Sequence, residues 1–263
     1  MISERIIEAF SLPPERVGRE IRSDTQKELT GKELNLLRSE FPGFESWIKE
    51  KTVVDFGCGL GFQTAALANA GAKLVLGLDV NEEYIDYATK HAQECAGNKE
   101  KVLFSANYKG EVCKYDAVIS QNAMEHYSDP SEVLERMKDL IHEDGQLMIT
   151  FGPPWYAPYG SHMHFFCKLP WVNILFPEKA VMQVRKKYRN DGARRYEEVE
   201  SGLNKMSLSK FEKLCKNHRL EVVYRNFRCI KGLDFLSHIP ILRELFINRV
   251  TVILKKCSQG SSY

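Results

Sequence analysis

The chain has 263 residues, of which 43% are hydrophobic and 27% charged, and its formal net charge is +2. This length allows one α/β domain with an elaborated cap or two small domains, and one domain is preferred. The near-neutral charge gives no global reason to expect a nucleic-acid partner. The seven cysteines are odd in number and lack CxxC spacing. They indicate neither a zinc site nor a disulfide framework, and they favour a reducing, cytoplasmic location.

The first 50 residues are expected to form helices that cover the first strand. Apolar residues fall on one side at Ile6, Ile7 and Phe10, and again around Leu34. No apolar run of signal-peptide type occurs near the start. No window approaches the roughly 18 uninterrupted apolar residues of a membrane helix, so we expect no transmembrane segment.

A strand that ends in a glycine turn is the feature around which the rest of the chain is organised. Val53, Val54 and Phe56 predict the end of a buried strand, and an apolar helix begins after the turn. Asp55 precedes the glycines Gly57, Gly59 and Gly61. Such a turn presents free backbone N–H groups to a ligand, and glycine allows positive φ and a close approach. The spacing Asp-x-Gly-x-Gly-x-Gly differs from the Gly-x-Gly-x-x-Gly of dinucleotide enzymes.

An acidic residue follows the second predicted strand, Lys73 to Leu78. Because the carboxyl ends of parallel strands face the ligand crevice, Asp79 is placed to accept hydrogen bonds from a ribose diol. The alternative role for Asp79 is to cap the next helix, but Asn81 is the better cap. We therefore expect Asp79 to contact a ligand.

Three more strands are predicted at Val102 to Phe104, Tyr115 to Ser120 and Gln146 to Phe151. An amphipathic helix that starts after Asp129-Pro130 joins the last two. With the glycine turn, Asp79 and the phrase Gln121 to His126, this order resembles the class I S-adenosylmethionine (SAM) dependent methyltransferases over residues 52–151.

The resemblance implies SAM as the cofactor and a set of residues that contact it. These are Asp55, Gly57, Gly59, Gly61, Asp79, Val80, Ala106, Asn107, Gln121 and Asn122. In this family an acid after the third strand holds the adenine amino group, and this chain has no acid there. The side-chain oxygen of Asn107 is expected to accept that hydrogen bond instead. Gln121 and Asn122 are expected to border the sulfonium.

The resemblance also implies an α/β, Rossmann-like fold with a seven-stranded, mostly parallel sheet and helices on both faces. The last two strands are predicted at Leu220 to Arg225 and Arg249 to Lys255, with the final strand antiparallel between strands five and six. The expected parts of this single domain are an N-terminal helical cover (1–50), a SAM-binding core (51–152), an inserted substrate cap (153–206) and the C-terminal part of the core (207–257).

The predicted cap is rich in proline and aromatic residues, including Pro153 to Tyr156 and Pro170-Trp171. At the carboxyl edge of the sheet, these residues are placed to wall a substrate pocket. The alternative is that the aromatic residues attach the cap to the core, and both roles can hold together.

Three histidines are candidates for the base that removes a hydroxyl proton during transfer. His162 and His164 lie two apart and would share one face of an extended segment. His126, past the fourth strand, is the third candidate. No nearby Asp or Glu completes a metal ligand set, so no metal site is expected. Ordinary packing remains the alternative for each histidine.

Residues 185–195 hold six basic residues against Asp191. A solvated face is the default interpretation, since Glu197 and Glu198 follow and offset the charge. The functional alternatives are a clamp for a phosphorylated or acidic substrate and a weak contact with an anionic membrane surface beside the aromatic run at 165–176.

The favoured function is methyl transfer from SAM to a small-molecule acceptor, with the hydroxyl of a sugar, a lipid-linked compound or another secondary metabolite preferred. One alternative is RNA methylation through residues 185–195. Another is a SAM-binding, methyltransferase-like scaffold that has lost its chemistry, supported only by the missing acid near Asn107. The acceptor is the expected partner, nucleic acid is not, and the oligomeric state is left open.

Overall fold

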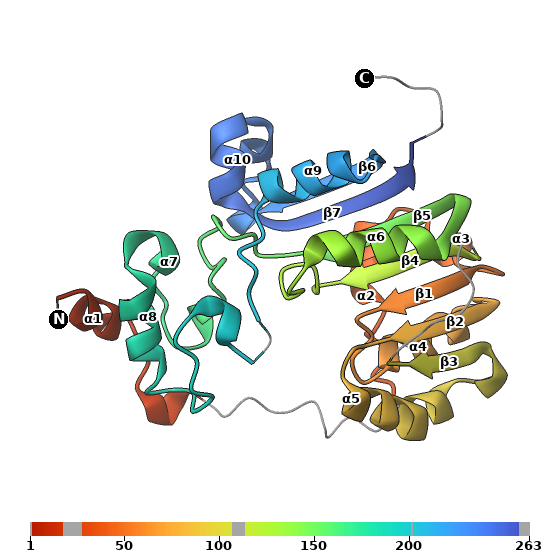
Figure 1. Ribbon diagram of the computed structural model, residues 1–263, viewed down its shortest axis with the longest axis horizontal. Coiled ribbons are helices and arrows are strands. Elements are labelled where there is room, and N and C mark those ends of the chain that lie inside the picture. Colours follow the sequence, from red (N-terminus) through yellow and green to blue (C-terminus); the bar gives the residue numbers. More distant parts are fainter. Residues whose placement is uncertain (1, 18–27, 107–113, 201, 258–263) are drawn as a thin grey trace.

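The computed structural model describes residues 2–17, 28–106, 114–200 and 202–257, and it has an α/β architecture built on one mixed sheet (Figure 1). The strands of the sheet are β1 (Thr52–Phe56), β2 (Leu74–Leu78), β3 (Val102–Ser105), β4 (Tyr115–Gln121), β5 (Ile141–Phe151), β6 (Leu220–Cys229) and β7 (Ile247–Lys256). Their order is β3-β2-β1-β4-β5-β7-β6. Neighbours from β3 to β5 are parallel, whereas β7 is antiparallel to both β5 and β6. The predicted fold, including the reversed last strand, is confirmed.

The strand register brings several carboxyl ends to one edge of the sheet. Phe56 at the end of β1 pairs with Leu78 at the end of β2. Gln121 at the end of β4 pairs with Thr150, next to the end of β5. Loops that leave these four strands therefore meet at the same edge, which is where a ligand binds in open parallel sheets.

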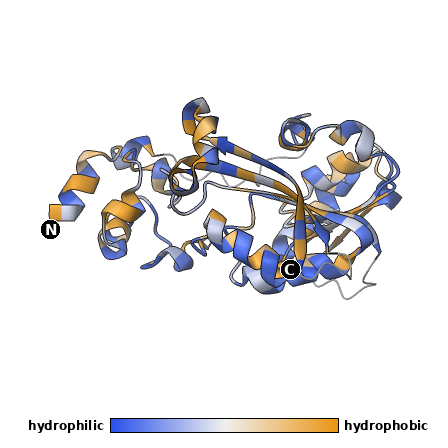
Figure 2. Ribbon diagram, turned by 90° about the horizontal axis from the view of Figure 1, so that it is seen from above, coloured by the Kyte–Doolittle hydropathy of each residue, from blue (hydrophilic) through white to orange (hydrophobic). Residues whose placement is uncertain are grey.

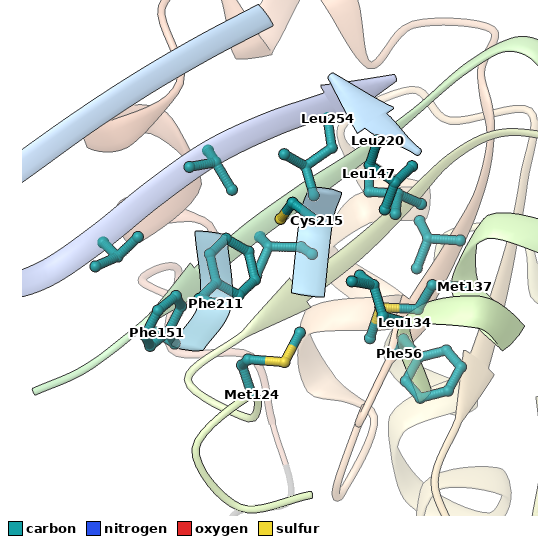
Figure 3. Close-up of a cluster of buried hydrophobic side chains, with 14 of the residues drawn as sticks. Phe56, Met124, Leu134, Met137, Leu147, Phe151, Phe211, Cys215, Leu220 and Leu254 are labelled. Carbon is teal, nitrogen blue, oxygen red and sulfur yellow. The ribbon is translucent and has the colours of Figure 1, made fainter. Parts of the chain in front are cut away.

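Helices cover both faces of the sheet, which explains why its central strands read as continuous apolar runs. The helices of the core are α2 (Asn35–Glu40), α3 (Phe44–Trp47), α4 (Phe62–Asn69), α5 (Glu82–Tyr87), α6 (Pro130–Leu140), α9 (Leu208–Asn217) and α10 (Pro240–Phe246). One hydrophobic cluster joins α6 and α9 to the sheet and includes Phe151 and Phe211, whose rings pack against each other (Figure 3). A second cluster joins α2, α3 and α4 to the other face through Phe41, Leu67 and Val53.

Local chemistry fixes where the helices begin. Asn81 accepts hydrogen bonds from the backbone N–H groups of Glu83 and Tyr84, so the predicted cap of α5 is confirmed. Asp129 caps α6 ahead of Pro130, and Ser207 caps α9 in the same way. Helix α5 leaves regular α-helical geometry after Tyr87, and the chain continues through a π turn at Ala88–Ala92.

The N-terminal segment is divided between two parts of the molecule, which differs from the expected single cover of residues 1–50. Helices α2 and α3 pack on the sheet, whereas α1 (Ile2–Ala9) packs against α8 (Glu178–Arg185). Ile7 is fully buried there in a third cluster with Val181 and Tyr196. Figures 1 and 2 show this N-terminal helix at one end of the long axis and the sheet toward the other.

The segment that was predicted as a cap carries α7 (Val172–Leu175), α8 and short 3-10 turns. It returns to the sheet beside the loop after β4, because the Asn204 N–H donates to the Glu125 carbonyl and the Trp155 N–H donates to the Met206 carbonyl. In the described part of the chain, no helix has the length and apolar character needed to cross a membrane.

Candidate functional site

The glycine turn folds back onto the end of β2. Gly57, Gly59 and Gly61 all have positive φ, at 78°, 52° and 79°, as predicted from their spacing. The expectation that the turn offers free N–H groups to a ligand is wrong at its first positions. The N–H groups of Gly57 and Cys58 both donate to the Leu78 carbonyl, at 2.8 and 2.9 Å, because the turn crosses directly over that strand end.

The three glycines have different surroundings. A Cβ at Gly61 would lie 2.6 Å from the Phe104 ring and 2.7 Å from the Ala88 methyl group, so this glycine is needed for packing. A Cβ at Gly57 would lie 3.2 Å from the Tyr127 hydroxyl. At Gly59 no atom of the described chain lies within 4 Å of that position. Gly59 is therefore the glycine that a ligand can approach closely.

Asp55 lies beneath the turn, not at its surface. It is 1% exposed, and its carboxylate accepts hydrogen bonds from Gln63 Nε2 and Thr64 Oγ1, both at 2.7 Å. Burial raises the pKa of this carboxyl to about 6, although the two hydrogen bonds oppose the rise. Gln63 also accepts from the Gln121 amide and so links the turn to the end of β4. Asp55 is thus placed to hold the start of α4, and Gln63 and Thr64 are residues that the sequence analysis missed.

Asp79 sits between the glycine turn and α5. Its Oδ2 accepts from the Gly59 N–H at 2.9 Å, and its Oδ1 accepts from the Asn81 N–H at 3.0 Å. A carboxylate has about four acceptor positions, so each oxygen keeps capacity for a ligand hydroxyl. Val80, next in the chain, is 86% exposed, which is unusual for a large apolar side chain and leaves a bare apolar surface beside the carboxylate.

Of the predicted adenine contacts, only one can be placed. Ala106 directly follows β3, at the carboxyl edge and partly buried. Asn107 lies outside the described residues.

The loop after β4 is anchored by a buried methionine. Asn122 adopts a left-handed conformation with φ 50°, and its N–H donates to the Thr150 carbonyl at 2.8 Å. Met124 is fully buried in the same hydrophobic cluster as Phe151 and Phe211 (Figure 3). This anchor fixes the position of the following residues at the sheet edge.

His126 and His162 meet at this edge with their rings edge to face and their centroids 5.3 Å apart. The His126 Nδ1 lies 2.8 Å from the Gly202 carbonyl oxygen. A carbonyl can only accept, so Nδ1 carries the proton and Nε2 of the neutral ring is left with its lone pair. His162 bonds to the Pro153 carbonyl, and its Nε2 is buried without a partner among the described residues. Burial, with His126 nearby, lowers the pKa of His162 to about 4.

His164 does not join this pair. The expectation of a shared face assumed an extended segment, and that assumption is wrong. His162 has a left-handed conformation with φ 57°, and a 3-10 turn follows at Met163–Phe165. The turn directs His164 to the surface, where its ring packs against Tyr159 at 4.5 Å between centroids.

Two further polar residues, not singled out from the sequence for these roles, tie the loops together. Glu125 is 3% exposed, and its Oε1 accepts from the Gly152 N–H at 3.1 Å, while Oε2 has no partner among the described residues. Burial raises the pKa of Glu125 against the opposing effect of His126. The Asn204 side-chain amide donates to the carbonyls of Met124 and Tyr127, both at 2.8 Å.

The aromatic residues of the predicted cap mainly attach it to its neighbours. Trp155 packs edge to face on Tyr196, 4.9 Å between centroids, within the third hydrophobic cluster. The Trp171 ring contacts Phe246 of α10 at 5.9 Å. Tyr156 differs, because it is 43% exposed and remains available to a ligand.

Some of the basic residues at 185–195 form ion pairs within the chain. The buried Arg185 guanidinium makes a bidentate pair with Asp191, at 2.7 and 2.5 Å. Lys187 pairs with Glu8 at 2.7 Å. These pairs favour the solvated, internally paired face over a clamp for a polyanion. Within the described ranges, no group of three or more His, Cys, Asp or Glu side chains is arranged to hold a metal ion.

Comparison with known proteins gives matches that centre on the sheet and its glycine turn. A family model described as "Methyltransferase domain" matches residues 48–153. The ubiquinone biosynthesis O-methyltransferase of Actinobacillus pleuropneumoniae is 32% identical over 106 residues, covering 38% of this chain and 45% of that protein. The enzyme of the same name from Paraburkholderia phytofirmans is 30% identical over 120 residues, covering 45% and 51%. The chain therefore matches only about half the length of these relatives.

Solved structures share the fold over a larger part of the chain. The crystal structure of a "putative S-adenosylmethionine dependent methyltransferase" from Listeria monocytogenes matches over 87% of this chain and 99% of its own, with a TM-score of 0.56 and 16% identity. The magnesium protoporphyrin IX methyltransferase of Synechocystis, solved with bound SAH, covers 97% and 99%, with a TM-score of 0.53 and 19% identity. Identities this low establish the fold alone.

Proposed function

The chain belongs to the class I SAM-dependent methyltransferases, and on that premise we propose that it transfers a methyl group from SAM to a hydroxyl group of a small molecule. The observation that carries the proposal is the meeting of two sets of residues at one sheet edge. The glycine turn with Asp79 and Val80 forms one set, and the His126–His162 pair forms the other. Tyr127 connects them, because its hydroxyl lies over Gly57 while His126 is its neighbour in the chain.

The first set fits the adenosine part of SAM. Two acceptor positions of the Asp79 carboxylate remain for the ribose hydroxyls, and charge-assisted hydrogen bonds of this kind are strong. The exposed Val80 side chain offers an apolar surface for the adenine ring. The open space beside Gly59 lets the cofactor approach the chain closely. Asp55 acts from below by holding Gln63 and Thr64, and so shapes the turn without touching the ligand.

When bound, SAM supplies an electrophilic methyl group on its sulfonium. The chain must then align the acceptor oxygen with that carbon, exclude water and take the hydroxyl proton. Gln121 and Asn122, at the end of β4, are our candidates to border the transfer point. Their positions are held through the bond of Gln121 to Gln63 and of Asn122 to Thr150.

Among the three histidines, the geometry favours His126 as the proton acceptor. Its Nδ1 is held by the Gly202 carbonyl, so its Nε2 lone pair is free to accept, and the ring is partly exposed. His162 is a weaker base because its pKa is lowered to about 4, far below the pH at which a general base works best. We assign His162 to positioning the His126 ring. His164 faces solvent beside Tyr159 and has no assigned role.

A small-molecule acceptor is supported over RNA by the charges of the chain. Part of the basic run is paired internally, namely Arg185 with Asp191 and Lys187 with Glu8, and the net charge is only +2. The matched relatives named as ubiquinone biosynthesis O-methyltransferases act on oxygen by their names, which supports a hydroxyl as the acceptor group. The scaffold alternative rests on the segment around Asn107 and gains no support from the described residues.

Labelled methyl transfer tests the proposal. The purified protein is incubated with isotopically labelled SAM and separate RNA and small-molecule fractions of source-cell extract, and the label is traced by mass. We expect label in a small molecule, and its loss in an Asp79→Ala control. Label in RNA alone would establish the alternative, and SAM binding without transfer to any fraction would favour the scaffold.

A further inference from the structure

A cavity of about 460 Å³ lies at the far end of the sheet, between the carboxyl end of β6 and the segment that leads into α10. This is within the range of small-molecule sites. None of the residues assigned above to SAM or to proton transfer lines it. Figure 1 shows α10 beyond the ends of β6 and β7, on the side of the sheet toward α7.

The polar lining of the cavity is mainly basic. Arg225, His238 and Arg243 line it, against the single carboxylate of Asp234. Asp234 is already engaged, because its Oδ1 accepts from the Cys229 N–H at 2.7 Å. In the described structure, no hydrogen bond or ion pair involves the side chain of Arg225 or His238.

Arg243 contributes a fixed donor. One of its terminal nitrogens pairs with Glu212 of α9 at 2.8 Å, which holds the guanidinium in place. Its Nε is buried and has no partner among the described residues. An unpaired buried donor costs free energy, so this end of the guanidinium is not fully satisfied within the chain.

The walls of the cavity also include two phenylalanines. Phe227 is partly buried against the core cluster, whereas Phe235 is 63% exposed at the cavity. A free inorganic anion would use the arginines and leave these rings uncovered. A ligand that joins an acidic group to an aromatic or other apolar body would contact both.

We propose that this cavity is a second binding site, which takes an organic anion: a carboxylate or phosphate attached to an apolar group. Arg225 is the main charge partner, Arg243 and His238 supply further donors, and the two phenylalanines contact the apolar part. Two sources share this chemistry, the acidic end of the methyl acceptor itself and a separate ligand.

If the ligand of the cavity is the acidic end of the methyl acceptor, the sheet geometry sets the length of that acceptor. The strand order places β6 three strand spacings from β4, which is about 14 Å at about 4.8 Å per spacing. An acceptor that reached from Arg225 to the transfer point would therefore be elongated, with its acidic end remote from the methylated hydroxyl. This identification rests on the proposed function, whereas the cavity's preference for an organic anion does not.

Binding of phenyl phosphate to the full chain saturated with SAH tests the site, with benzyl alcohol as the uncharged counterpart. We expect phenyl phosphate to bind and benzyl alcohol to bind far more weakly. Arg225→Gln should weaken phenyl phosphate binding by about 10- to 100-fold, the equivalent of one hydrogen bond to a charged group. Arg228→Gln is the matched control, because Arg228 is on the same strand but on the opposite face, beside Glu40.

Equal binding of the two probes, or equal losses in the Arg225 and Arg228 variants, would overturn the proposal. The binding measurement is independent of turnover, so it stands even if no methyl transfer is found. Where transfer is found, the inhibition caused by phenyl phosphate is measured with and without added acceptor. Relief by the acceptor would show that the cavity binds the acidic end of the acceptor. Inhibition that the acceptor does not relieve identifies a separate ligand.

Discussion

Replacing Asp79 by alanine separates cofactor binding from the stability of the turn. The carboxylate accepts two backbone hydrogen bonds, from Gly59 at 2.9 Å and from Asn81 at 3.0 Å, and we propose that it accepts two more from the SAM ribose. The substitution removes all four bonds and the charge together. It should therefore lower both SAM affinity and the free energy of unfolding.

The two effects have different magnitudes. Loss of hydrogen bonds to a charged acceptor should weaken SAM binding by about 1.5–3 kcal/mol, which is about 10- to 150-fold in Kd. Loss of the two backbone bonds should lower the free energy of unfolding by about 1–3 kcal/mol, since each such bond contributes about 1 kcal/mol. Calorimetric titration with SAM measures the first effect, and urea unfolding without ligand measures the second.

Asn81→Ala provides the matched control. It removes the cap of α5, which accepts from Glu83 and Tyr84, and it should cost about 1 kcal/mol of stability. Its SAM affinity should stay within twofold of the parent. If a folded Asp79→Ala variant bound SAM as tightly as the parent, Asp79 would not contact the cofactor. If both variants lost affinity equally, the effect of Asp79 would be only structural.

His126→Ala should reduce the turnover rate by a factor of about 10²–10⁴ without changing SAM affinity, whereas His164→Ala should stay near the parent rate. A slow His164→Ala variant together with a normal His126→Ala variant would reverse the assignment. The pKa of His162 is about 4 in the folded chain and about 6.5 in the unfolded chain, so between these values the unfolded chain binds more protons. The stability that this residue contributes is therefore lost as pH falls from about 6.5 to 4. As pH falls through that range, the unfolding free energy of the parent should fall by up to about 3 kcal/mol relative to that of His162→Ala. A difference that does not change with pH would contradict the low pKa of His162. Both Gly59→Ala and Gly61→Ala should lower the unfolding free energy by about 1 kcal/mol, because both glycines have a left-handed φ. Gly61→Ala should cost more than this through overpacking, and only Gly59→Ala should also reduce SAM affinity; the opposite pattern would exchange their roles.

The sheet could be predicted from the sequence because its signals are local. Apolar runs bounded by turn residues identified each strand. Asn81 and Asp129 identified the starts of two helices, because the side chain of each accepts hydrogen bonds from the N–H groups two and three residues later. The antiparallel last strand followed from the resemblance and not from any pattern within Ile247–Lys256.

The candidate site was harder to predict because it depends on contacts between distant segments. The pairing of His126 with His162 brings together two loops that are separate in the sequence, and His162 has a left-handed conformation that is uncommon outside glycine. Two of the N–H groups expected to be free in the glycine turn, those of Gly57 and Cys58, donate to the Leu78 carbonyl, since the turn folds onto the neighbouring strand. Gln63 and Thr64 did leave a signal, as polar residues in the first turn of an otherwise apolar helix.

The location of α1 also lay beyond local patterns. Its apolar stripe shows that one side is buried but not which partner buries it. Ile7 is fully buried against α8, about 170 residues later in the chain, and not against the sheet.

The bonds that join residues 202–206 to the loop after β4 set a boundary for exchanging the predicted cap between relatives. Gly202 supplies the carbonyl that orients His126, and Asn204 holds the carbonyls of Met124 and Tyr127. A chimera that replaced residues 166–199 would keep these contacts and the His126–His162 pair, so it should retain the orientation of His126. A chimera cut after residue 206 would remove them. Grafting a complete cap would therefore require the donor to carry its own equivalent of this return segment.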